Sequence, residues 1–371
     1  MLKRVSIQNF KSLKDVTLDL QKVNLLIGPN NSGKTNFLKA LEFFEFGVLH
    51  DDVAAERQAR NLRFNRSANV LSIGLIFQRQ GEELTFLREL VFSDLSNAVD
   101  VKSAQVVTKD GVELTRNNQG YPDTAFLRQQ LTLLRIYRPD PNKLTQPGPV
   151  GTGAETVSDD ASNLIGFLDR MLGNQYRKTV FNRIETDLQI CVPEFDEISI
   201  DDASPTEELK RLFPKNSFKR LGLTNSKQGV TYWADELSEG TLYFIALLCI
   251  INQPNPPKLL LLEEPEKGIH PRRIREVMNF IRRMVAEKDI QVIMTTHSPL
   301  LLDEFAESPE SVFVFDKNQD GATFVQNLQR DVIEPANQEN TRLGIPPVHY
   351  TDALGEYWTI GFLGGIPYEA A

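Results

Sequence analysis

The chain has 371 residues, of which 41% are hydrophobic and 25% are charged, and these proportions are those of an ordinary globular protein of two or three domains. The net charge of −9 argues against a protein that coats DNA, although it leaves room for a local basic groove. No stretch of apolar residues approaches the roughly 18 that a membrane span needs, and no apolar signal-peptide core follows the charged N-terminal residues. The two cysteines are far apart in the sequence and form no metal-binding pair. We therefore expect a cytoplasmic protein without a membrane partner.

The first third of the chain predicts strands around one helix. Two short strands and the apolar segment KVNLLIG fill residues 1–28, and a helix is predicted from Gly33 to Phe46, with Phe37, Leu38, Leu41 and Phe44 on its apolar side. Residues 69–116 alternate in the manner of strands, and KDG at 109–111 is a hairpin turn signal. We therefore expect a β meander inserted after the first helix.

Strands and helices alternate in the second half. Helices are expected at about 162–188, 239–252 and 271–287, short strands between 195 and 233, and further strands at KLLLLE, IQVIMTT, 311–315 and 322–326. Strands that alternate with helices indicate an α/β fold with a parallel sheet covered on both faces.

A stretch dense in Pro, Gly, Thr and Asp marks the boundary between two lobes. We expect five consecutive segments: 1–138 as lobe I with the meander, 139–162 as a linker, 163–233 as an insert of helices and short strands, 234–330 as lobe II, and 331–371 as a C-terminal extension.

The strongest motif is a glycine-rich octamer, G-x-x-x-x-G-K-[ST], which follows an apolar strand and opens a helix. Backbone N–H groups of such a loop wrap phosphates, Lys34 would reach the outer phosphates, and the Thr35 hydroxyl would ligate Mg²⁺. This indicates a site for a nucleotide and Mg²⁺. The nucleotide-binding residues are expected to be Gly28, Pro29, Asn30, Asn31, Ser32, Gly33, Lys34, Thr35 and Asn36.

Two adjacent carboxylates end the strand KLLLLE. Four leucines in a row indicate a central parallel strand, and ligands bind at the carboxyl ends of such strands. Hydrolysis needs one acid for the magnesium shell and one for the attacking water. We assign Glu263 to the metal and Glu264 to the water; alone, the acids would only start a loop.

Two further polar groups lie at the ends of predicted elements, where they could contact a bound phosphate. His297 ends the strand IQVIMTT and could hydrogen-bond the γ-phosphate, although a lone histidine is more often structural. Ser238 precedes an apolar helix that it would cap, and together with Gly240 it could bind an anion at the helix N-terminus. The capping role alone is the alternative for Ser238.

The order of these motifs, P-loop, LSEGT, LLLLEEPE and TTHSP, resembles the Walker A, signature, Walker B and switch-histidine order of ABC-type ATPases. The opening VSIQNFKSLKDVTLDL and the segment EEPEKGIHP resemble the RecF-like and OLD-like branch, also grouped as AAA family ATPases. The resemblance covers about 1–50 and 230–305 firmly. It implies an ATPase head with mixed and parallel sheets, flanked by helices and carrying the meander and a helical lobe.

The resemblance also implies a head-to-tail dimer, because the chain carries one copy of each motif. The P-loop of one chain and the Ser238 and Gly240 of the other would hold each ATP, and Glu266, Lys267, Gly268 and His270 would communicate across the interface. The signature is LSEGT instead of LSGGQ, and Glu263 stands where many relatives have aspartate. Neither change removes a catalytic group. Gln78, Gln80 and Gln146 are equal candidates for the glutamine of the loop that joins the lobes.

Three interpretations of the whole protein stay open. The segment after His297 contains no DxD, so no nuclease of the Toprim type is expected. The chain could be the sensor ATPase of a bacterial anti-phage defence system with a separately encoded effector. It could be a RecF-like repair ATPase that binds duplex DNA, or a nucleotide-gated scaffold. The closing segment HYTDALGEYWTIGFLGGIP would either dock a partner or cover the core.

Overall fold

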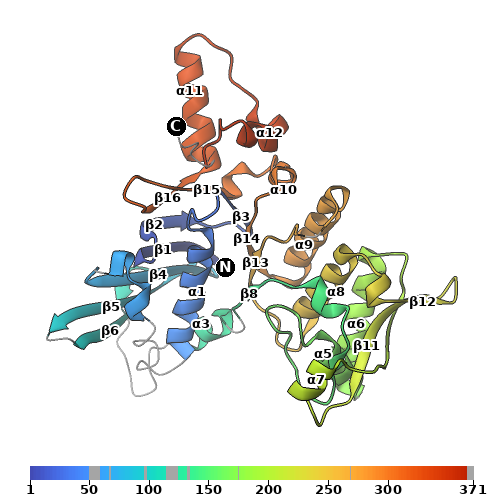
Figure 1. The fold of residues 1–371 in the computed structure, drawn as a ribbon. Helices are drawn as coiled ribbons and strands as arrows, with labels where there is room; N and C mark the ends of the chain where they lie inside the picture. Colours follow the sequence, from blue (N-terminus) through green and yellow to red (C-terminus); the bar gives the residue numbers. More distant parts are fainter. Residues whose placement is uncertain are drawn as a thin grey trace. The chain divides into compact units, whose positions relative to one another are not determined.

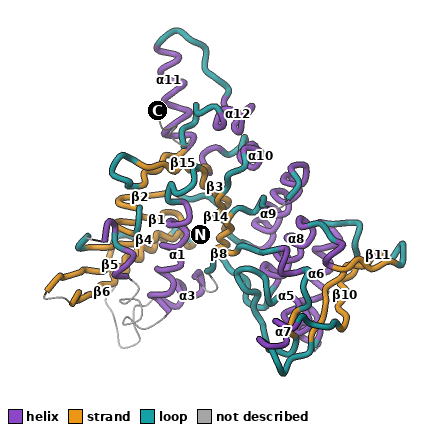
Figure 2. The backbone as a smooth tube through the Cα atoms, in the orientation of Figure 1, coloured by secondary structure: helices purple, strands orange, loops and turns teal. Residues whose placement is uncertain are grey.

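The computed structural model describes residues 1–49, 59–66, 68–95, 98–113, 124–131, 134–173, 175–267 and 269–365 (Figures 1 and 2). They form two compact units. Unit 1 contains Met1–Ile136, Lys258–Pro265 and Lys288–Ala371, and unit 2 contains Tyr137–Pro257 and Glu266–Glu287. The units are interleaved in sequence, whereas the five segments expected above are consecutive, and that division stays a prediction.

Within the described residues, unit 1 is organised around a mixed sheet of 12 strands, in the order β7-β6-β5-β4-β1-β2-β16-β15-β3-β14-β13-β8. Its last strand, β8, spans the boundary of the two units. The strands are β1 (Leu2–Phe10), β2 (Leu13–Asp19), β3 (Val23–Ile27), β4 (Val70–Arg79), β5 (Glu82–Leu95), β6 (Ala98–Lys109), β7 (Val112–Glu113), β8 (Ile136–Tyr137), β13 (Leu259–Glu263), β14 (Gln291–Thr295), β15 (Val312–Lys317) and β16 (Thr323–Asn327).

The two sides of this sheet have different strand directions. Strands β13, β14, β3 and β15 are mutually parallel and almost wholly buried, as their unbroken apolar runs predict. Strands β4 to β7 form the predicted antiparallel meander. Asp110 and Gly111 join β6 to β7 with φ of 49° and 80°, the left-handed pair that a tight hairpin requires. The meander and its KDG turn are thus confirmed.

Helix α1 (Lys34–Leu49) follows β3 and packs its apolar side into the core of unit 1. The four predicted core residues, Phe37, Leu38, Leu41 and Phe44, are all buried. The Phe37 ring lies edge-on against Phe315 of β15, with 6.0 Å between ring centroids. Because α1 is fixed in this way, its N-terminus at Lys34 is held at the carboxyl ends of β3 and its neighbours. A second helix of unit 1 is α3 (Thr124–Leu131).

The C-terminal part of unit 1 contains α10 (Pro299–Asp303), a π-helical turn at Leu328–Ile333, α11 (Glu334–Arg342) and α12 (Leu354–Thr359). Leu354, Trp358 and Leu363 are buried, while Ile360 and Phe362 are 58% and 67% exposed. The closing segment therefore covers core residues with one side and leaves apolar side chains on the other.

Unit 2 contains a small sheet and the most apolar helix of the described chain. Strand β11 lies between β10 and β12 and also pairs with β9, and α8 is buried from Gly240 to Asn252. The helices predicted over about 162–188 are α5 and α6, which separate after Leu172, and the predicted linker contains α4 and β9. The elements are β9 (Gly148–Pro149), β10 (Glu197–Asp202), β11 (Phe218–Asn225), β12 (Val230–Trp233), α4 (Pro141–Leu144), α5 (Leu164–Leu172), α6 (Gln175–Cys191), α7 (Glu207–Leu212), α8 (Glu239–Asn252) and α9 (Ile274–Lys288).

Candidate nucleotide-binding site

The glycine-rich loop leaves β3 at Gly28 and enters α1 at Lys34. Gly28 has φ of 136°, and a Cβ atom there would lie 2.1 Å from the Phe315 carbonyl oxygen. Gly33 has φ of 112°, and its Cβ would lie 2.3 Å from Thr323 Oγ1. Both positions combine a left-handed backbone with a close approach, so both require glycine. These two contacts press the loop against β15 and β16.

The interior of the loop holds a cation and a fixed carbonyl group. Lys34 is buried, and its Nζ donates to the carbonyl oxygens of Gly28 (2.7 Å) and Pro29 (2.9 Å). Thr323 Oγ1 donates to the Ser32 carbonyl oxygen (2.7 Å). With that carbonyl turned toward β16, the loop keeps one backbone orientation around the lysine ammonium group.

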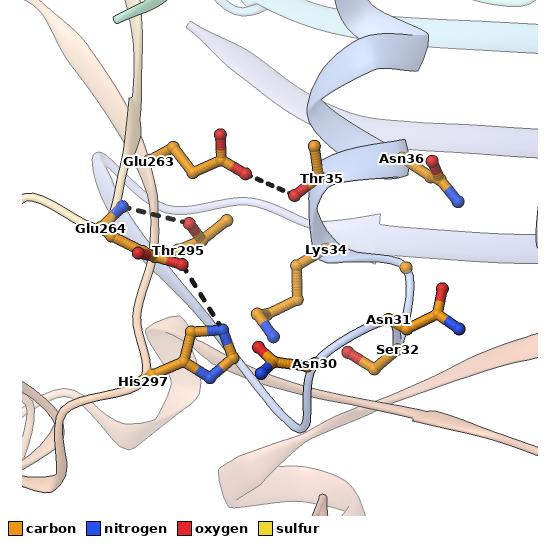
Figure 3. A pocket seen from close by; sticks show the side chains of 11 residues that line it. Asn30, Asn31, Ser32, Lys34, Thr35, Asn36, Glu263, Glu264, Thr295 and His297 are labelled. Atoms are coloured by element: carbon orange, nitrogen blue, oxygen red, sulfur yellow. Dashed lines mark hydrogen bonds and ion pairs between the residues drawn. The ribbon is translucent and has the colours of Figure 1, made fainter. Parts of the chain in front are cut away.

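The first carboxylate meets the P-loop threonine. Strand β13 ends at Glu263, and its side chain accepts a hydrogen bond from the Thr35 hydroxyl, although the two residues are 228 positions apart (Figure 3). A hydroxyl and a carboxylate oxygen in contact are hard oxygen donors, and one or two carboxylates with substrate phosphates are how proteins commonly bind Mg²⁺. The residues therefore fit this ion.

The second carboxylate points another way. Glu264 has φ of 49°, a left-handed conformation that is strained for a residue with a side chain and is common at functional sites. Its backbone N–H donates to Thr295 O (3.1 Å) and Thr295 Oγ1 (3.3 Å), which fastens the end of β13 to the end of β14. Its carboxylate Oε1 lies 3.6 Å from His297 Nε2 (Figure 3).

His297 is favoured in its neutral form. Burial lowers the pKa of the imidazole, the positive charge of Lys34 lowers it further, and the negative charge of Glu264 acts in the opposite direction. A neutral imidazole has one N–H to donate and one nitrogen to accept with. His297 can therefore donate to a phosphate oxygen.

These side chains surround one pocket of about 350 Å³. Every described residue that lines it belongs to unit 1. They are Asn30, Asn31, Ser32, Gly33, Lys34, Thr35, Asn36, Glu263, Glu264, Thr295 and His297 (Figure 3). Ser32 adds a buried hydroxyl oxygen that has no hydrogen-bond partner in the described structure, a group that a bound phosphate would satisfy. The pocket thus brings together the predicted P-loop, both carboxylates and the switch histidine.

The signature residues belong to unit 2. Ser238 caps α8, since its Oγ accepts from the Thr241 backbone N–H (3.2 Å). Gly240 is buried, and a Cβ atom there would make only ordinary van der Waals contacts, with Ile269 and Ser238 at 3.9 Å. Glu266, Lys267 and His270 also lie in unit 2, and Gly268 lies outside the described residues.

Three polar residues of the site are absent from the prediction. Thr295 lies in the strand that leads to His297, so its place at the strand end could have been inferred. Thr323 belongs to no recognisable motif. Ser12 lies in the opening segment VSIQNFKSLKDVTLDL, for which no site role was predicted; its Oγ accepts from Asn36 Nδ2 (2.9 Å). The glutamine candidates Gln78, Gln80 and Gln146 are not among the described residues that line the pocket.

Two family models match this chain. One, described as "AAA ATPase domain", matches residues 1–113, and the other, described as "AAA domain, putative AbiEii toxin, Type IV TA system", matches residues 186–303. The chain is 23% identical over 335 residues to the OLD nuclease of Thermus scotoductus, which covers 82% of the chain and 60% of that protein. The chain thus carries ATPase domains of the AAA type, and it is similar to the RecF-like and OLD-like branch of the ABC-type P-loop ATPases.

Further comparisons support this ATPase head. The chain is 30% identical over 122 residues to the DNA replication and repair protein RecF of Psychromonas ingrahamii, which covers 30% of the chain and 34% of that protein. A solved Smc head domain derived from Pyrococcus yayanosii matches 91% of this chain and 99% of its own with a TM-score of 0.51 at 10% identity, which shows a shared fold. The chain spans less than two thirds of the length of these two curated relatives. Among the described helices, none is long and apolar enough to cross a membrane.

Proposed function

We propose that this ATPase binds MgATP in the pocket of unit 1 and hydrolyses it as a head-to-tail dimer. The observation that carries the proposal is the arrangement of Thr35 beside Glu263 and of His297 beside Glu264 around one pocket. The chain carries one LSEGT signature and one P-loop, so two complete sites need two chains related by a twofold axis. Ser238 and Gly240 of the second chain would close each site.

Each side chain has a role that follows from its contacts. Lys34 supplies a buried positive charge for the outer phosphates, and Thr35 and Glu263 would hold Mg²⁺. The ion neutralises charge on the β- and γ-phosphate oxygens when it is bound. Glu264, whose strained backbone turns its carboxylate toward His297, orients the attacking water and accepts its proton. His297 donates to the γ-phosphate and responds to its presence.

The proposed physiological role is that of the sensor ATPase in a bacterial anti-phage defence system, with a separately encoded effector. Two similarities support it. The family model that residues 186–303 match is described as "AAA domain, putative AbiEii toxin, Type IV TA system". The similarity to the OLD nuclease covers 82% of this chain. The exposed Ile360 and Phe362 offer apolar surface for a partner protein.

A turnover assay tests the enzymatic part. We expect Mg²⁺-dependent ATP hydrolysis by the pure protein, with Glu264→Gln as the blank that binds ATP but turns it over at least about a hundredfold more slowly, since general acid–base catalysis supplies about 10²–10⁴-fold. Glu264→Gln should accumulate as an ATP-dependent dimer in size-exclusion chromatography with light scattering. Hydrolysis at the wild-type rate by this variant would refute the assignment of Glu264.

The sensor role has its own test. The protein expressed from its native operon should co-purify with the product of a neighbouring gene. A monodisperse dimer without any such partner would count against a separately encoded effector.

A second candidate is a RecF-like ATPase that binds duplex DNA, which the similarity over 122 residues favours. It predicts duplex binding that weakens steeply with salt, together with ATP turnover that duplex DNA stimulates. Turnover that is indifferent to DNA, with no binding at low salt, would exclude it. ATP-driven dimerisation without DNA binding or a partner protein would instead identify a nucleotide-gated scaffold.

A further inference from the structure

The closing segment of the chain lies against the start of the P-loop. Gly365 has φ of 63°, and a Cβ atom there would lie 2.7 Å from Val314 Cγ1 of β15 and 3.3 Å from the Cα atom of Gly28. Gly28 is the first residue of the loop, and its own backbone presses on Phe315. The backbone of Gly365 therefore supports the point at which the phosphate-binding loop leaves β3.

The same segment also contacts both ends of α10, the helix that follows the switch histidine. The Gly355 backbone N–H donates to Asp303 Oδ1 at 2.7 Å. A Cβ atom on Gly355 would lie 2.5 Å from the Pro299 carbonyl oxygen, so α12 is in close contact with a residue two positions after His297.

A buried tryptophan connects these two contacts. Trp358 is 7% exposed, and its Nε1–H donates to the Gly365 carbonyl oxygen at 3.3 Å. Gly355, Trp358 and Gly365 thus form one continuous brace, with one end at α10 and the other end at Gly28. All of the atoms in this chain of contacts belong to unit 1.

We propose that this brace, Gly355–Trp358–Gly365, positions the switch histidine and the P-loop relative to each other for ATP binding and hydrolysis. The three are positioning residues, because they act through Pro299 and Gly28 and do not line the pocket as described. The proposal rests on the ATPase function proposed above. It assigns the C-terminal extension a role in the chemistry in addition to its covering of core residues.

Adjacent glycines supply a matched pair of variants. Gly364 and Gly365 have similar φ values of 73° and 63°, so alanine takes a left-handed φ that is disfavoured for a residue with a side chain at both. A Cβ on Gly364 would lie 3.9 Å from Val314 Cγ1, an ordinary contact, whereas one on Gly365 would overlap Val314 and approach Gly28. The comparison separates the contact with the P-loop from backbone strain.

The experiment measures ATP affinity and turnover separately in the full chain, with thermal unfolding as a check on folding. A displacement of about 1 Å at a site can change rates by about a hundredfold. We expect Gly365→Ala to raise the Kd of a fluorescent ATP analogue about tenfold over Gly364→Ala, which is about 1.4 kcal/mol, because the added methyl group crowds Gly28 at the start of the phosphate-binding loop. Gly355→Ala should lower kcat about tenfold with a smaller change in Kd, because it displaces the residues after His297. Trp358→Phe keeps an aromatic six-membered ring but removes the pyrrole ring with its N–H donor, and should shift Kd in the direction of Gly365→Ala.

Several results would overturn the proposal. Equal Kd values for the alanine variants at Gly364 and Gly365 would show that the contact with Gly28 does not matter. Changes in Kd and kcat that simply follow the loss of thermal stability would show a structural role only. If Gly365→Ala does not fold, unchanged binding and turnover in Trp358→Phe would serve as the refutation. Wild-type protein that binds the analogue without hydrolysing ATP would refute the proposed function, while the Kd comparison would still test the brace.

Discussion

Thr323 offers the sharpest test of how the P-loop is held. This residue starts β16, is 3% exposed, and donates from Oγ1 to the Ser32 carbonyl oxygen at 2.7 Å. Thr323→Ala removes the hydroxyl and the methyl group, and Thr323→Ser removes the methyl group alone. The difference between the two variants therefore reports the hydroxyl group.

The magnitude follows from the buried hydrogen bond. A typical intramolecular bond contributes about 1 kcal/mol net, and an acceptor left buried without its donor raises the loss to about 3 kcal/mol. If the bond fixes the loop for phosphate binding, about 1 kcal/mol corresponds to roughly a fivefold weaker Kd for ATP in Thr323→Ala than in Thr323→Ser. A loss of 3 kcal/mol would correspond to more than about a hundredfold.

The assay is a titration of both variants with ATP and Mg²⁺ by calorimetry, together with urea unfolding. We expect Thr323→Ala to bind ATP more weakly than Thr323→Ser and to have a lower free energy of unfolding in urea. Equal ATP affinities for the two variants, with a difference only in unfolding, would refute the view that this bond orders the loop for nucleotide. A neighbouring hydroxyl at Ser12 lies 2.8 Å from Thr323 Oγ1, so Ser12→Ala serves as the control for loss of a hydroxyl without loss of the bond to the loop carbonyl.

Three further predictions follow from the site. Lys34→Ala should abolish tight ATP binding in the same titration, because it removes the buried cation of the loop; affinity within threefold of wild type would contradict this role. The pKa of His297, measured by NMR, should lie below the ordinary imidazole value of about 6.5. Because the Lys34 charge lowers this pKa and the Glu264 charge raises it, Lys34→Ala should raise the pKa and Glu264→Gln should lower it further. Shifts of the opposite sign would show that these two charges do not control the protonation of the ring. Ser238→Ala should destabilise unit 2 by about 1 kcal/mol through loss of the helix cap, whereas Ser238→Asp should keep the cap and weaken ATP-driven dimerisation; undiminished dimerisation of Ser238→Asp would argue against a role of Ser238 at the partner's phosphates.

The sequence predicted those parts of the site that depend on short-range pattern. The octamer from Gly28 to Thr35 carries its backbone requirements and its ligands in consecutive residues. The four leucines before Glu263 indicate a buried parallel strand whose end faces ligand, and the same argument applies to the strand before His297. Helix α1 and the meander also follow local periodicity, and the structure agrees with both.

Contacts between distant segments were beyond this reasoning. The bond from Thr323 to Ser32 joins residues 291 positions apart, and neither the threonine nor its strand has a motif. The brace at Gly365 has the same character, because the glycines near the C-terminus could equally have been turn residues. The interleaved composition of the two units likewise depends on which strands become neighbours, and a single sequence does not encode that in any local pattern.

The backbone at Glu264 shows how one local conformation serves both halves of the proposed chemistry. An extended residue there would continue β13, whereas φ of 49° ends the strand and lets the Glu264 N–H bond to Thr295. That bond holds the end of β13 to the end of β14. It therefore fixes Glu264 relative to Thr295, the residue two positions before His297. A left-handed non-glycine residue is destabilising by about 1–3 kcal/mol, and the hydrogen bonds to Thr295 offset this strain. The two adjacent carboxylates point in different directions, as successive residues at a strand end do, one toward Thr35 and one toward His297. The proposed water activation beside a metal site uses this arrangement.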